Sequence, residues 1–98
     1  MKLLSFAVLV FILALTSQGA EFADPVRLEG DGKPVRVESP GYACPCWADI
    51  DADGKKDLLV GQFANGKIHV FKNLGDNKLA AGEWLQADGK PAEVPGVW

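Results

Sequence analysis

The chain has 98 residues, with 10 Lys and Arg against 13 Asp and Glu, which gives a formal net charge of −3. It contains no basic patch or stripe, which argues against nucleic acid as a partner. A chain this short buries only a modest fraction of its surface on folding. Domains of this size often depend on a metal ion, a disulfide or a neighbouring chain for stability.

The first 20 residues have the three zones of a secretory signal peptide. Lys2 supplies the positive charge, residues 3–15 form an apolar run, and residues 16–20 are small or polar. The apolar run is shorter than the roughly 18–20 residues that cross a bilayer, so a membrane anchor is disfavoured. We therefore predict a signal peptide at 1–20.

Cleavage of this signal peptide is expected after Gly19 or after Ala20, where small residues occupy the required positions. The mature region would then be residues 21–98. It contains no second hydrophobic segment, so we expect no membrane span in the mature chain. The predicted location is secreted or extracytoplasmic, in the periplasm or at the cell surface.

Beyond residue 20, turn-forming residues recur at short intervals and no long apolar pattern at helical period is present. This pattern predicts an all-β fold. Asp-Gly and Asn-Gly pairs mark hairpin turns within residues 30–34 and at 65–66. A further turn is expected at 73–77. The predicted strands cover residues 26–29, 35–38, 43–48, 58–61, 67–72 and 83–86.

The chain contains an internal repeat. Residues 28–37 match residues 85–94 at six of ten positions, and the two copies begin 57 residues apart, at Leu28 and Leu85. A period near 50 residues is typical of arrays of blade-like units. We expect one complete unit and the opening hairpin of a second. Because one such unit cannot bury its own apolar face, the chain is expected to be a fragment or to assemble with other chains.

An acidic loop at residues 49–57 contains the most informative group of candidate ligand residues in the chain. Carboxylates occupy positions one, three, five and nine of the loop, and Gly54 stands at position six, where the backbone must turn sharply. Oxygen ligands at this spacing wrap a hard cation. The flexible geometry favours Ca²⁺ over Mg²⁺, which requires a tighter octahedron. The predicted ligands are the side chains of Asp49, Asp51, Asp53 and Asp57 and the backbone carbonyl of Lys55.

The acidic loop has two alternatives to a calcium site. An EF-hand requires a Glu at position twelve and a helix on each side, whereas this chain has Val60 there and predicted strands on both sides. The other alternative is a solvated acidic turn, because Asp and Gly are common in turns. The complete five-position pattern favours the metal site over the turn.

Residues 48–61, followed by residues 66–75, resemble an FG-GAP/VCBS repeat. The close match covers residues 46–75. This resemblance implies one antiparallel blade of a β-propeller, of about four strands, whose first two strands are joined by a calcium-binding loop. It also implies Asp49, Asp51, Asp53, Asp57 and the Lys55 carbonyl as ligands. Members of the family carry several such repeats, whereas this chain carries one and the start of a second.

The resemblance implies an exported calcium-binding module with a binding role, in adhesion or ligand recognition, and without catalytic activity of its own. Its partners would be further propeller blades or other chains, and a protein or glycan ligand. One alternative is the N-terminal part of a propeller enzyme, a lyase or hydrolase acting on polysaccharide. Another is a truncated product without independent function.

Cys44 and Cys46 form the next candidate site. A disulfide between residues so close in sequence would be strained, and His69, the only histidine, is far from them in sequence. A metal or redox role is disfavoured, because no further Cys or His lies near the pair in sequence. Two interpretations remain open. The cysteines pair with cysteines of another unit, as is common in exported proteins, or they are small buried residues on an inner strand.

His69 and the aromatic residues complete the candidates. His69 is expected to be a surface or edge residue that faces away from its neighbours Ile68 and Val70, because side chains alternate along a strand. The aromatic residues are expected to pack between blades, with stacking on sugar rings as the alternative. These residues are Tyr42, Trp47, Phe63, Trp84 and Trp98.

Overall fold

The computed structural model describes residues 19–96. Most of the predicted signal peptide, residues 1–18, lies outside this range, as does Trp98. The described part is built of β-strands and one short 3₁₀ turn, η1 (Ala64–Gly66), and has no α-helix. The all-β prediction is therefore confirmed for residues 19–96. No helix in this range has the length and apolar character needed to cross a membrane.

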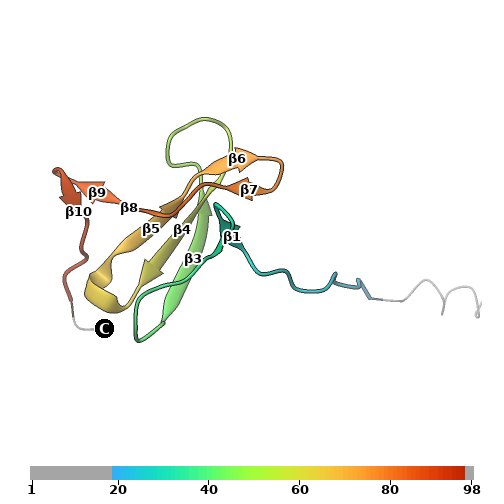
Figure 1. The fold of residues 1–98 in the computed structure, drawn as a ribbon, viewed down its shortest axis with the longest axis horizontal. Helices are drawn as coiled ribbons and strands as arrows, with labels where there is room; N and C mark the ends of the chain where they lie inside the picture. Colours follow the sequence, from blue (N-terminus) through green and yellow to red (C-terminus); the bar gives the residue numbers. More distant parts are fainter. Residues whose placement is uncertain (1–18, 97–98) are drawn as a thin grey trace, which may run out of the picture.

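A four-stranded antiparallel sheet forms the centre of the fold (Figure 1). Its order is β3 (Ala43–Ala48), β4 (Asp57–Gln62), β5 (Ile68–Phe71) and β8 (Glu83–Trp84). The structure confirms the strand predicted at 43–48, and it extends the strand predicted at 58–61 by one residue at each end. The acidic loop joins β3 to β4 at one end of the sheet, and η1 joins β4 to β5 at the other.

One face of this sheet is covered and holds the core. The register pairs Leu58 with Phe71, so these side chains share a face with Val60, and all three are buried. Val35, Val37 and Leu79 pack against them from outside the sheet. We call this the covered face. Its three buried side chains are the only buried large apolar residues within the described part of the chain.

Within residues 19–96, the opposite face of the sheet has no such cover. The register places Cys44, Cys46, Leu59, Ile68 and Val70 on this side. The two cysteines are exposed and the three aliphatic side chains are only partly buried. We call this apolar surface, defined by these five residues, the open face.

A second, smaller sheet packs beside the first, with the order β2 (Lys33–Pro34), β1 (Glu29–Gly30), β7 (Lys78–Leu79) and β6 (Asn73–Gly75). The hairpin predicted between 26–29 and 35–38 is shorter than expected. The N–H of Val35 still donates to the Leu28 carbonyl at 3.0 Å, but the pairing ends there, and Val35 and Val37 pack on the core. The segment 73–77, predicted as a simple turn, contributes β6 to a hairpin with β7. Asp76 and Asn77 supply the positive φ angles that its tight turn needs.

The repeat found in the sequence is a repeated hairpin in the structure. β1 and β2 pair as Glu29 with Pro34, and β9 (Gln86–Ala87) and β10 (Lys90–Pro91) pair in the same register as Gln86 with Pro91. The turns match too, since φ is 50° at Asp31 and 51° at Asp88. The two hairpins differ in their surroundings. β1 pairs with β7, whereas β9–β10 forms a separate two-stranded sheet that stands apart from the central one (Figure 1).

Two glycines allow the first hairpin to close over the core. A Cβ atom on Gly30 would lie 2.6 Å from Cδ1 of Phe71, and one on Gly82 would lie 2.6 Å from its Cε1. Because atoms cannot approach this closely, the Phe71 ring requires glycine at both positions. Phe71 thereby joins the two sheets, and it fixes the end of β5 beside the acidic loop.

Candidate metal centre

Three aspartates converge where the acidic loop meets the start of β4. One carboxylate oxygen each from Asp49, Asp51 and Asp57 lies within 4.8 Å of the other two. Asp57 is the first residue of β4, and the other two lie in the loop between β3 and β4. Oxygen atoms grouped in this way are the ligands that hard cations such as Ca²⁺ prefer.

Backbone N–H groups of the loop hold its carboxylates in position. Asp49 accepts hydrogen bonds from the N–H of Asp53 at 3.2 Å and of Gly54 at 2.9 Å. The N–H of Asp53 also donates to Asp51, and that of Lys55 donates to Asp53 at 2.9 Å. These bonds turn the backbone around the carboxylates and hold Asp49, Asp51 and Asp53 toward the inside of the loop.

Asp57 anchors the loop to the central sheet. It is 0% exposed, and its two carboxylate oxygens accept hydrogen bonds from different segments of the chain. The N–H of Ile50 donates to Oδ2 at 3.2 Å, and the N–H of Asn73 donates to Oδ1 at 2.8 Å. The Asn73 side chain returns a hydrogen bond to the Lys56 carbonyl at 2.9 Å. Asp57 therefore ties the loop to β6 as well as to β4.

The sharp turn predicted at Gly54 is present. Its φ is +85°, in the region that favours glycine, while a Cβ atom there would meet nothing within 4 Å. The requirement for glycine is therefore one of backbone conformation rather than space. Ala52 also has a positive φ, of 59°, which costs about 1–2 kcal/mol for a residue with a Cβ atom.

A lysine from outside the loop contacts the acidic group. Lys72, next to the end of β5, forms an ion pair with Asp51, and its Nζ lies 3.6 Å from Oδ2 of Asp53. Sequence reasoning missed this residue, because its approach depends on the pairing of β4 with β5. It also missed Asn73, whose role depends on the fold of the 73–79 hairpin.

The five predicted ligands therefore have different positions in the structure. Asp49, Asp51 and Asp57 form the cluster, whereas Asp53 is not part of it and has a carboxylate oxygen 3.6 Å from Nζ of Lys72. The carbonyl of Lys55 remains a predicted ligand. The structure supports a cluster of three carboxylates that could hold a metal ion, and the identity of that ion remains a prediction.

Cys44 and Cys46 are free thiols on the outer strand β3 of the central sheet. Both side chains are exposed on the open face, so the interpretation as buried residues is wrong for the chain in this structure. Pro45, between them, is compatible with an outer strand. The N–H of Phe63 donates to the Tyr42 carbonyl on the β3 side, whereas the N–H of Gln62 points the other way and donates to the Lys67 carbonyl. Because hydrogen-bonded pairs alternate along an antiparallel ladder, the pair of Pro45 with Val60 is a non-bonded one, and the Pro45 nitrogen points away from β4.

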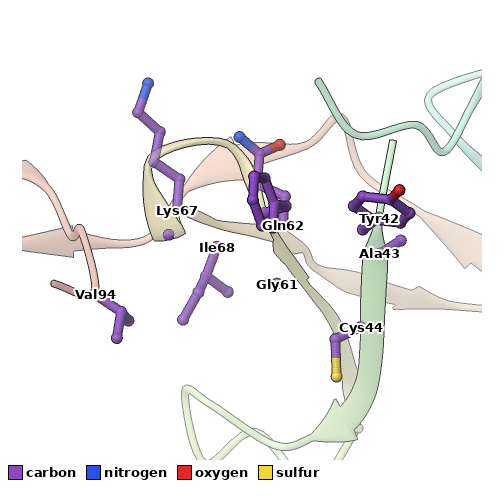
Figure 2. Close-up of a pocket in the computed structure, with 10 residues that line it drawn as sticks. Tyr42, Ala43, Cys44, Gly61, Gln62, Lys67, Ile68 and Val94 are labelled. Carbon is purple, nitrogen blue, oxygen red and sulfur yellow. The ribbon is translucent and has the colours of Figure 1, made fainter. Parts of the chain in front are cut away.

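A hollow of about 340 Å³ lies at the η1 end of the open face. Figure 2 shows Cys44, Ile68 and Val94 directed to one side of the sheet, whereas Gln62 and Lys67 point to the other. Tyr42 and Phe63 border the hollow and meet edge to face, with ring centroids 5.7 Å apart. The walls are largely apolar and carry no cluster of titratable groups.

His69 lies on the covered face, opposite to Ile68 and Val70 as predicted. It is not the surface residue that the sequence suggested, because the ring stacks on Trp84 with centroids 3.7 Å apart and Nδ1 is buried without a hydrogen-bond partner. Burial lowers the pKa of His69 below its ordinary value of 6.5. The negative charge of Glu38 acts in the opposite direction without cancelling this effect.

The four predicted aromatic residues within the described range, Tyr42, Trp47, Phe63 and Trp84, do not form one surface. Trp84 is half-buried against His69, Trp47 is 48% exposed on β3, and Tyr42 pairs with Phe63 at the hollow. The alternation along β3 places Trp47 on the same side as Leu58, its partner in the register. The structure therefore does not gather these side chains into a common platform for a sugar.

Comparisons of this chain with protein-family models, with curated proteins and with solved structures found no match.

Replacing Asp57 with Asn should destabilise the protein in the absence of metal. The amide can accept one hydrogen bond, but its NH₂ group would face a backbone N–H donor in a buried site. We expect the free energy of unfolding to fall by about 2–3 kcal/mol, as for a lost hydrogen bond to a charged group. Urea denaturation in chelator measures this, with Asp53→Asn as the control that makes the same chemical change at a more exposed carboxylate. Equal losses in the two variants would contradict the anchoring role of Asp57.

The stability of the protein should fall as the pH decreases from 7.5 to 5.5. Below pH 6.5 the unfolded chain takes up a proton on His69, whereas the folded chain, with its lowered pKa, does so only at lower pH. Protons therefore favour the unfolded state in this window. The chain has one histidine, so thermal melting of His69→Phe should show a flatter pH dependence. Parallel curves for the two proteins would rule out this coupling.

Proposed function

We propose that this protein is an exported calcium-binding repeat module, one blade of a β-propeller, whose role is structural and in binding rather than catalysis. The observation that carries the proposal is the cluster of Asp49, Asp51 and Asp57 between two adjacent antiparallel strands. A bound Ca²⁺ would neutralise carboxylates that otherwise repel one another, and it would fix the loop to β4. The resemblance of residues 46–75 to an FG-GAP/VCBS repeat supports the same site.

Calcium should raise the melting temperature of the purified protein. An ion that binds only the folded state at 100 times its Kd adds about 2.7 kcal/mol, which corresponds to a rise of about 10 °C or more for a domain of this size. Thermal melting in chelator and in millimolar calcium measures this, with magnesium as the comparison ion. The double variant Asp49→Asn, Asp51→Asn should lose the response. Identical melting of the unmodified protein in chelator and in calcium would overturn the calcium proposal.

We further propose that the partner of this module is another unit of the same kind, which covers the open face. Two features support this. The apolar side chains of Leu59, Ile68 and Val70 are only partly buried, whereas the matching positions of the covered face are packed. The β9–β10 hairpin has the geometry of β1–β2 but, among the described residues, no sheet to extend. A second unit would cover the open face, and it would provide a sheet for the β9–β10 hairpin to extend.

Self-association tests the assembly proposal. The purified protein should sediment as a dimer or larger species, and Ile68→Lys on the open face should shift it toward the monomer without lowering its β-sheet signal. Val26→Lys is the matched control, because Val26 is 85% exposed and lies outside the open face. A wild-type protein that stays monomeric at high concentration, or a control that dissociates equally, would contradict the assembly through this face.

A further inference from the structure

We propose that Lys72 is a built-in counter-ion of the acidic loop, which a metal ion must displace in order to bind. This inference rests on the calcium site proposed above and names a residue that sets its affinity and selectivity. Lys72 forms an ion pair with Asp51 and lies 3.6 Å from a carboxylate oxygen of Asp53. Its ammonium group is therefore beside two of the predicted metal ligands.

The position of Lys72 is set by the fold. Phe71, the preceding residue, is clamped in the core between Gly30 and Gly82. The Lys72 carbonyl accepts a hydrogen bond from the N–H of Ala80 at 2.8 Å, and the next N–H, that of Asn73, donates to Asp57. The backbone on both sides of Lys72 is thus fixed beside the metal cluster, and its side chain needs little freedom to reach it.

Other lysines near the loop do not share this role. Lys55 and Lys56 are within the loop itself, yet neither forms an ion pair in residues 19–96. In this part of the chain the compensation of the loop charge by a side chain comes from Lys72. Its side chain is 50% exposed, so it can move into solvent when another cation takes its place.

The proposed role of Lys72 also makes the loop selective for divalent over monovalent cations. A monovalent ion brings no more charge than the ammonium group and must compete with a cation that is held at the site by its own chain. A divalent ion brings twice the charge and contacts several carboxylates together, so it can displace Lys72. The loop should therefore respond to calcium at concentrations of sodium or potassium that leave it unchanged.

Lys72→Met and Lys56→Met form the matched pair for the experiment. Both remove one positive charge near the loop, but only the first removes an ion pair. In chelator, Lys72→Met should melt several degrees below wild type, whereas Lys56→Met should melt close to it. By calorimetric titration, Lys72→Met should bind calcium about three- to fivefold more tightly than wild type, and Lys56→Met less than about twofold. Lys72→Arg, which keeps the charge, should stay near wild type in chelator.

The possible results separate this inference from the calcium proposal. Equal effects of Lys72→Met and Lys56→Met on both measurements would overturn the role of Lys72. If no variant binds calcium, the calcium site is wrong, and melting in chelator still decides whether Lys72 compensates the loop charge. If Lys72→Met folds only in calcium while Lys72→Arg folds without it, the counter-ion role is supported. If neither folds under either condition, Lys72 is a general packing residue and the proposal fails.

Discussion

The buried carboxylate of Asp57 is the interaction on which the acidic end of the molecule depends. Its residue has no exposed surface, and its two oxygens accept hydrogen bonds from Ile50 in the loop and from Asn73 at the start of β6. A buried charge without partners is costly, whereas one that accepts backbone hydrogen bonds is held firmly in place. Asp57 thus connects three segments that are separated in sequence. The convergence of Asp49 and Asp51 on the same point follows from this anchor.

The Phe71 ring is the second contact on which the fold depends, because it joins the two sheets. It is buried between Gly30 and Gly82, which come from segments before and after the central strands. The core that results is small and lies on one face of the central sheet. The open face carries apolar side chains without a cover, so hydrophobic burial remains to be gained by association. The metal ion and the partner proposed above would each add stability to a chain whose own core is small.

Part of this fold follows from local sequence. The limits of β3 were predicted without error, and the matching hairpins β1–β2 and β9–β10 share Asp-Gly turns whose backbone conformation depends on neighbouring residues alone. Other predictions were wrong where distant contacts decide. The strand predicted at 35–38 is absent, because Val35 and Val37 pack on the core. The turn predicted at 73–77 is present at Asp76 and Asn77, but the strands β6 and β7 that it joins were not predicted. His69 is partly buried, because it stacks on Trp84 of a strand that a local pattern does not place beside it.

The sequence by itself determined the candidate ligands Asp49, Asp51, Asp53 and Asp57 and the sharp turn at Gly54, because a loop that surrounds an ion is a local pattern of side-chain spacing. Only the tertiary structure decided which of these carboxylates converge and what else reaches them. Lys72 and Asn73 approach the loop through the register of β5 against β4 and through the hairpin that follows. That register is fixed by the packing of Leu58, Val60 and Phe71, a contact between strands that no single stretch of sequence contains.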